Sequence, residues 1–291
     1  MVVDILVNGL ATSGMYALLA VGFALIFSVA RILNMAHTAF YMIAAFLFYI
    51  GTSLCKMGFL TSTIAAVALT VILGVICYKL FFDRVKEHEQ TVMIISVALA
   101  MLAQEIFSLL FGGTYRGIDP IFNGYYELGG GTRISYQHIF AIISTSIILA
   151  CVWVWLSKTR LGNAIRAVAQ DAEIANLMGI NDRHMCVIVM TVSVIMAAIA
   201  GVVMAPIGMV HPHMWAQPIV VVLAAVILGG MGSIGGSLIG AIILGYVETV
   251  VAFLLPGGAF LGPSVALLIM VLVLMIRPEG LFGVFFEEER L

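Results

Sequence analysis

The chain has 291 residues, of which 63% are hydrophobic and only 10% are charged, and its formal net charge is −2. Soluble globular domains are about 45–50% apolar and about 25% charged. The composition therefore excludes a water-soluble fold of this size and indicates an integral membrane protein. The sequence contains no basic patch that would suggest nucleic acid as a partner.

Continuous apolar runs cover most of the chain, and a membrane-spanning helix needs about 20 such residues. We predict an all-α membrane domain over residues 1–291, with about eight spanning helices. The predicted spans are 5–30, 38–55, 60–82, 91–112, 138–157, 186–210, 236–255 and 261–276. The run 218–229 is too short to cross alone, so we expect a short or broken helix near 218–236, buried against protein.

The distribution of Lys and Arg predicts the orientation of the domain. Cytoplasmic loops carry an excess of these residues, and the loop 157–185 contains Lys158, Arg160, Arg166 and Arg183. We therefore place this loop in the cytoplasm and the N-terminus and the loop 113–137 outside. The C-terminal tail lies in the cytoplasm only if 218–229 crosses the membrane as a full pass.

The loop 157–185 itself has the pattern of a short amphipathic helix. Its apolar residues Leu161, Ile165, Val168, Ala172 and Ala175 follow one another at spacings of three and four, which places them on one helix face. Thr159 suits the N-cap position and Gly179 the C-cap position. Such a helix either lies in the lipid interface or docks into a groove of a protein partner. Its mixed, acid-containing polar face leaves both possibilities open.

Four segments resemble the permeases of ABC importers of the branched-chain amino acid type, the family that takes up hydrophobic amino acids, urea and amides. They are GFALIFSVARILNMAHTAF (22–40), RAVAQDAEIANLMGI (166–180), VVLAAVILGGMGSIGGSLIGAIILG (221–245) and RPEGLFG (277–283). They follow one another in the order typical of the family and cover nearly the whole chain. Thr38 and Met35 depart from the glycine and the aromatic residue that the family usually has there.

The resemblance implies a fold similar to the vitamin-B12-type (type II) importer permeases, in a bacterial inner membrane. It also implies partners: two cytoplasmic ATPase subunits that bind ATP and Mg²⁺, a second permease subunit, an extracytoplasmic solute-binding protein, and membrane lipid. The loop 157–185 would be the coupling loop to the ATPases. We expect Arg166, Asp171, Ala172, Glu173 and Gly179 to carry that coupling. The implied substrates are small polar solutes, above all branched-chain or other amino acids.

We expect the chain to be a transport subunit with no catalytic, metal or cofactor site of its own. A nucleotide-binding P-loop needs a lysine directly after a glycine, and no lysine of this chain follows a glycine. Gly230, Gly232 and Gly235 spell GxGxxG, but the segment after them is apolar on all sides, which does not fit a dinucleotide site. We interpret Gly232, Gly236 and Gly240 instead as a stripe of small residues at a helix contact.

A few polar residues in or beside the spans are candidates for the substrate pathway. Ionisable groups inside spans usually face the protein interior or water, and Glu105 and Glu248 lie in apolar runs. For Glu105 we favour local pairing with Gln104, whereas Glu248 fits a pathway and a structural carboxyl equally well. Asn34 and His37 match the family's Asn-x-Ala-His run, although Asn34 also suits a capping position at the next helix.

Two other functions remain as alternatives at this point. An ATP-independent secondary transporter or channel would also contain a broken helix and intramembrane carboxylates. It would take up its solute without an ATPase and would respond to an ion gradient. An intramembrane enzyme ranks last, because the sequence shows no nucleophile, metal or cofactor constellation.

Overall fold

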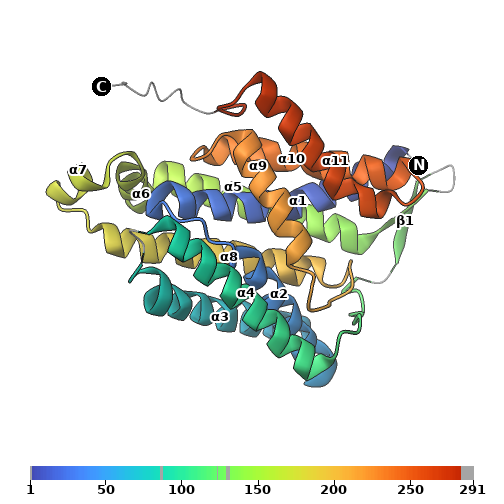
Figure 1. Cartoon of the computed structure of the whole chain (residues 1–291). Coiled ribbons are helices and arrows are strands. Elements are labelled where there is room, and N and C mark those ends of the chain that lie inside the picture. Colours follow the sequence, from blue (N-terminus) through green and yellow to red (C-terminus); the bar gives the residue numbers. More distant parts are fainter. Residues whose placement is uncertain (1, 86–87, 123, 129–131, 283–291) are drawn as a thin grey trace.

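The computed structural model describes residues 2–85, 88–122, 124–128 and 132–282. Over these residues the chain is a helical bundle with one small hairpin (Figure 1). The helices are α1 (Val2–Ala30), α2 (His37–Tyr49), α3 (Phe59–Cys77), α4 (Glu89–Phe111), α5 (Tyr136–Lys158), α6 (Arg160–Gln170), α7 (Ala172–Leu177), α8 (Asp182–Met204), α9 (Ala216–Gly229), α10 (Ile234–Leu254) and α11 (Gly258–Ile276). The π-helical turns η1 (Ile50–Leu54) and η2 (Tyr78–Phe82) extend α2 and α3, and the strands β1 (Tyr125–Leu128) and β2 (Thr132–Ser135) pair antiparallel.

Seven of the described helices are long and apolar enough to cross a membrane: α1, α2 with η1, α3 with η2, α4, α5, α8 and α10. The predicted span 261–276 is present as α11, but its apolar stretch Phe260–Ile276 is shorter than the others. The span predicted over 186–210 ends early, because α8 stops at Met204. Pro206 follows two residues later, and proline cannot continue the hydrogen-bond pattern of a helix.

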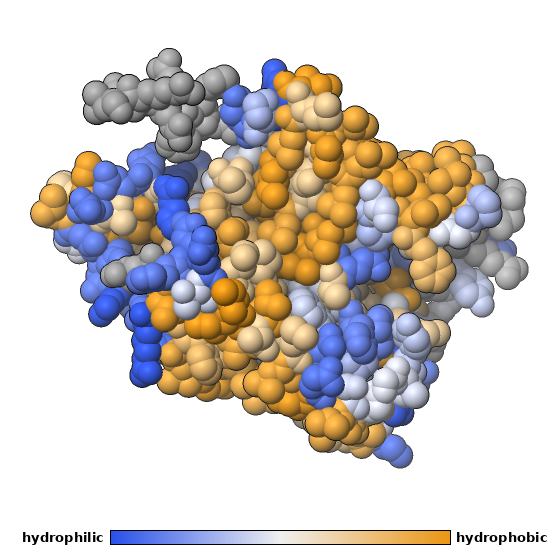
Figure 2. Space-filling view, viewed as in Figure 1, coloured by the Kyte–Doolittle hydropathy of each residue, from blue (hydrophilic) through white to orange (hydrophobic). Residues whose placement is uncertain are grey.

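Three spans form the centre of the bundle and the others surround it. Most residues of α1, α2 and α8 are buried inside the chain itself, whereas only a minority of those in α3, α4 and α5 are buried. Helix α1 runs through the middle of the view in Figure 1. A helix that is apolar on every side is typical of such a buried position. The outer helices expose apolar side chains instead, and Figure 2 shows them as a broad hydrophobic surface between more hydrophilic ends.

The two ends of the bundle differ in charge. The end that holds α6 and α7, here called the basic end, carries the basic residues Arg31, Lys79, Arg84, Lys158, Arg160, Arg166, Arg183 and Arg277. The other end, here called the outer end, holds the β hairpin and the start of α1 (Figure 1). The basic side chains that the structure describes there are Lys56 and Arg116. The positive-inside rule therefore predicts that the basic end faces the cytoplasm.

Helix α9 connects the two ends although it has only 14 residues. At ~1.5 Å per residue it is about 21 Å long, which is shorter than the hydrocarbon core of ~30 Å. The loop before it pairs with the outer loop through Arg116 and Val210. In its last turn, the Leu228 carbonyl accepts a hydrogen bond from Leu281 N–H at 2.8 Å. The segment up to Phe282 therefore lies at the basic end. This is the side that we predict for the C-terminal tail if 218–229 crosses the membrane as a full pass.

Helices α9 and α10 approach each other closely at small residues. A side chain added at Gly236 would overlap the Gly229 backbone, and one added at Gly240 would overlap the Ala225 carbonyl. Gly232 differs from the prediction, because it lies in the turn before α10 with φ 92° and an added Cβ there would meet no atom within 4 Å. Its backbone conformation, and not a helix contact, favours glycine.

Candidate functional site

The element formed by α6 and α7 is built from local capping and a buried face. The Thr159 side chain accepts a hydrogen bond from Gly162 N–H at 3.0 Å, so it caps α6 as the sequence predicts. Ile165 and Val168 are buried and hold α6 against the bundle. Arg31, at the end of α1, donates from Nη2 to the Ala169 carbonyl at 3.2 Å. This contact ties the last turn of α6 to the central helix of the bundle.

The predicted single helix of this loop is in fact two helices. Asp171 has φ −152° and ψ 108°, ends α6 and begins α7, and its Oδ1 accepts from Ile174 N–H at 3.0 Å. Aspartate at an N-cap satisfies an orphan backbone donor, which explains why the chain breaks here. The break rotates α7, so Ala175 is buried while Ala172 is exposed. The prediction that Ala172 belongs to the apolar face is therefore wrong.

The tip of this element exposes an apolar surface. Ile174, Leu177 and Met178 have exposed fractions of 59%, 87% and 79%, and Glu173 beside them is also exposed. Gly179 has φ 87° and closes α7, with Ile180 N–H donating to the Ala175 carbonyl. Large apolar side chains on a protruding tip are typical of a protein-binding site. We call Asp171–Gly179 the α7 tip.

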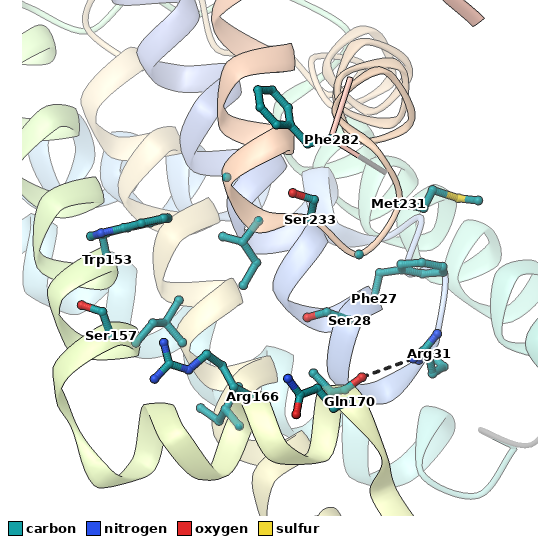
Figure 3. Close-up of a pocket in the computed structure, with 16 residues that line it drawn as sticks. Phe27, Ser28, Arg31, Trp153, Ser157, Arg166, Gln170, Met231, Ser233 and Phe282 are labelled. Carbon is teal, nitrogen blue, oxygen red and sulfur yellow. Dashed lines mark hydrogen bonds between the residues drawn. The ribbon is translucent and has the colours of Figure 1, made fainter. Parts of the chain in front are cut away.

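Arg166 lies away from the α7 tip. Its Nη2 donates to Asn163 Oδ1 at 2.6 Å, and its side chain lines a cavity next to α1 and α5 (Figure 3). The predicted coupling residues therefore fall into two groups. Asp171, Ala172, Glu173 and Gly179 belong to the tip, whereas Arg166 belongs to the cavity.

Asn34 and His37 form a buried junction between α1, α2 and α8. Asn34 Oδ1 accepts from Ala36 N–H at 3.1 Å, which supports the turn into α2. His37 Nδ1 and Ser193 Oγ of α8 lie 3.2 Å apart, and the rings of Phe23 and His37 pack edge to face. Both residues have no exposed surface, so neither lines a pathway in this structure. Their geometry supports a structural role in this conformation, and their place on the substrate pathway stays a prediction.

Glu248 lies in a small pocket about halfway along α1, beneath the loop that pairs with the outer loop, and we call it the outer pocket. Its Oε2 accepts from the Tyr16 hydroxyl at 2.7 Å, and its Oε1 accepts from Gln217 Nε2 at 2.8 Å. The pocket has a volume of about 250 Å³ and is formed by α1, α2, the loop before α9, and the start of α9. Tyr41 and His211 also line it. Of the three predicted pathway residues, Glu248 alone faces a described pocket.

The partners of Glu248 were not predicted from the sequence. Tyr16 and Gln217 are 232 and 31 residues away from it along the chain, and no local spacing signals that they meet. Glu105, the other carboxyl in an apolar run, accepts from its neighbour Gln104 at 3.1 Å, as predicted. Gln104 in turn accepts from Trp215 Nε1 at 2.8 Å. This second cluster fastens α4 to the loop before α9.

The comparisons with known proteins agree with this architecture. Residues 5–277 match the model of a family described as the branched-chain amino acid transport system permease component. The High-affinity branched-chain amino acid transport system permease protein BraD of Pseudomonas aeruginosa is 28% identical over 96% of this chain and 94% of its own length. The Inner membrane ABC transporter permease protein YjfF of Escherichia coli is 29% identical over 44% of this chain and 40% of its own length.

A solved structure shares the fold at low sequence identity. PsaBC from Streptococcus pneumoniae, in complex with a Fab, matches with a TM-score of 0.54 and 13% identity, over 94% of this chain and 92% of the matched chain. The likeness supports the predicted all-α membrane fold. Because the family model covers residues 5–277 of the 291, the chain belongs to the permease component family of branched-chain amino acid transport systems.

Proposed function

We propose that this chain forms the membrane pathway of an ABC importer that carries branched-chain amino acids, or closely similar small solutes, into the cell. Family membership supports a transport subunit. The substrate class follows that of similar permeases such as BraD, a protein of a branched-chain amino acid transport system. The observation that carries the proposal within the structure is the α7 tip, an exposed apolar surface on a capped helix at the basic end.

We assign the proposed partners to the two ends of the bundle. Each of two ATPase subunits, which bind ATP and Mg²⁺, docks on one α7 tip of a permease dimer. The second permease is either a copy of this chain or a different chain. A solute-binding protein delivers substrate at the outer end, beside the loop that contains His211 and Trp215. The apolar residues of the α7 tip supply buried contact area, and Glu173 at its edge supplies directional polar contact.

The structure suggests how force on the α7 tip reaches the pathway. Helix α6 is fixed to the bundle by Ile165 and Val168, and to α1 by the hydrogen bond from Arg31 to Ala169. About halfway along α1, the Tyr16 hydroxyl donates a hydrogen bond to Glu248. An ATPase that binds two permease conformations with different affinity shifts their populations. Displacement of α6 therefore alters the position of α1 and, with it, the outer pocket.

The outer pocket fits the role of the first contact for the solute. Glu248 is oriented by two hydrogen bonds, and its carboxylate oxygens retain acceptor capacity for a third group. The ammonium group of an amino acid matches this acceptor. The pocket volume of about 250 Å³ is below the ~300–1,000 Å³ of pockets for drug-sized ligands, as expected for a small solute.

Uptake of radiolabelled leucine into native membrane vesicles tests the proposal. We expect uptake to require ATP and the ATPase partner, and to persist when an ionophore removes the ion gradients. Uptake that continues without the ATPase partner and stops with the ionophore would instead establish the secondary transporter.

A further inference from the structure

A second cavity lies at the basic end and is not explained by the coupling contact. It has a volume of about 650 Å³ and is formed by the end of α1, the end of α5, α6, and the turn before α10. Arg31 and Arg166 lie on opposite sides of it, with Ser28 and Gln170 between them (Figure 3). Trp153 and Phe282 also line the cavity, farther from Arg31, and Phe27 lies next to Arg31 (Figure 3). The cavity therefore combines basic and polar groups with aromatic ones.

The charge of this cavity defines the kind of ligand. The described residues that line it include two arginines and neither aspartate nor glutamate. Each guanidinium has five N–H donors. The bond from Arg31 to Ala169 and the bond from Arg166 to Asn163 each use one of them. The remaining donors, together with the hydroxyls of Ser28 and Ser157 in the wall, match the oxygens of a phosphate group.

An apolar groove continues from this cavity into the membrane-spanning part of the bundle. It has a volume of about 270 Å³ and runs between α5 and α10 over Val21 of α1. Trp153, Leu156 and Ile234 line both the cavity and the groove, so the two spaces are adjacent. The groove is lined by apolar residues throughout, among them Leu149 and Leu238. A free phosphate would leave this groove empty, whereas a lipid acyl chain fits it.

We propose that the cavity and the groove together bind one anionic phospholipid, with its phosphate between Arg31 and Arg166 and an acyl chain along α5 and α10. Basic pockets between spans on the cytoplasmic side bind anionic headgroups. Trp153 lies at the junction, near the Lys158 end of α5, and tryptophan is enriched at membrane interfaces. Because Arg166 is on α6, a bound headgroup contacts the same element that carries the α7 tip. The lipid therefore stabilises the position of the coupling element relative to α1.

Native mass spectrometry of the full-length chain, purified in detergent, tests the proposal without any transport step. The probes are phosphatidylglycerol and phosphatidylcholine with identical acyl chains. We expect phosphatidylglycerol to bind more tightly, and Arg166→Gln to weaken its binding about fivefold, since a basic residue near an anionic headgroup contributes that much. Arg160→Gln is the matched control, because Arg160 is an exposed residue of α6 that does not line the cavity. It should leave phosphatidylglycerol binding unchanged.

A second pair of variants tests the acyl chain. Leu149→Trp fills the groove and should weaken phosphatidylglycerol binding several-fold, whereas Ile147→Trp, on the exposed side of α5, should not. Equal binding of the two lipids, or equal effects of Arg166→Gln and Arg160→Gln, would overturn the proposal. Full competition by glycerol phosphate would also overturn it, because that result identifies a free-anion site. The proposal would also be overturned if Leu149→Trp changed only the self-association of the chain, because that result would mean that the groove holds a second copy of the chain.

Discussion

The basic end and the outer end of this bundle use polar side chains in opposite ways. At the α7 tip, Asp171 caps the backbone and the apolar residues Ile174 and Leu177 point outward. In the outer pocket, the polar groups of Tyr16 and Glu248 bind each other, and further polar side chains such as Tyr41 and His211 line the same space. The first arrangement suits a large protein partner, which buries apolar surface. The second suits a small polar solute, which needs oriented hydrogen-bond partners.

Two elements join these ends. Helix α1 runs from the outer pocket to the contact between Arg31 and Ala169. Helices α9 and α10 run between the same two regions and touch closely at Gly236 and Gly240. Variants at either end of the bundle, or in the contact between α9 and α10, therefore test different parts of this comparison between the two ends.

The largest effect is expected at the α7 tip. Leu177→Asp replaces a side chain that is 87% exposed and that we expect to be buried by the ATPase. Removal of a central interface residue costs about 2 kcal/mol or more, so ATP-driven uptake should fall about 30-fold. Leu161→Asp is the control, because Leu161 is exposed on α6 outside the tip. Equal loss of uptake in the two variants would argue against specific docking at the tip.

The next effect concerns the contact between α9 and α10. Gly240→Leu places a side chain against the Ala225 carbonyl, and overpacking of this kind costs about 3 kcal/mol at the upper end. Gly232→Leu meets open space but keeps φ 92°, which costs about 1 kcal/mol. The midpoint of unfolding in detergent should fall clearly more for Gly240→Leu. The reverse order would mean that the turn, and not the helix contact, fixes this hairpin.

A smaller effect is expected at the outer pocket. Glu248→Gln retains hydrogen-bonding groups but removes the charge that we propose binds the ammonium group. We expect the KM for leucine uptake to rise about tenfold, which corresponds to the loss of one charged hydrogen bond of about 1.4 kcal/mol. Glu105→Gln is the matched control, because Glu105 contacts its own neighbour Gln104 on an exposed surface. An unchanged KM in Glu248→Gln would remove Glu248 from the pathway.

The smallest effect is expected at Asn34. Asn34→Ala removes the hydrogen bond from Ala36 N–H to the side chain, and loss of such a hydrogen bond costs about 1 kcal/mol. Stability in detergent should fall by that amount while the KM for leucine stays the same. A changed KM without loss of stability would place Asn34 on the substrate pathway.

Local signals allowed much of the fold to be predicted. The spans are visible as apolar runs, and Thr159 and Gly179 mark the ends of the loop helices because capping depends on neighbouring residues. The preference of aspartate for N-cap positions is a signal for the break at Asp171, but a single continuous helix also accommodates this residue. The prediction that the Ala172 side chain faces the bundle fails because of this break.

Contacts between segments that are far apart in the chain could not be predicted from the sequence. Glu248 was recognised as an unusual carboxyl, but its partner Tyr16 is 232 residues away. The contact of Arg31 with Ala169 and the cavity around Arg166 depend on how α1, α5 and α6 pack together. The pattern of a single segment contains no information on such packing.

Recovery of the ATPase partner from mild detergent, with this full-length chain as bait, tests the central claim most directly. The unchanged chain should recover an ATPase subunit from the native membrane, and the double variant Asp171→Arg with Glu173→Arg should lose it while remaining folded. Recovery of the chain alone, from membranes in which it still transports solute, would contradict the account and establish a transporter that works without an ATPase.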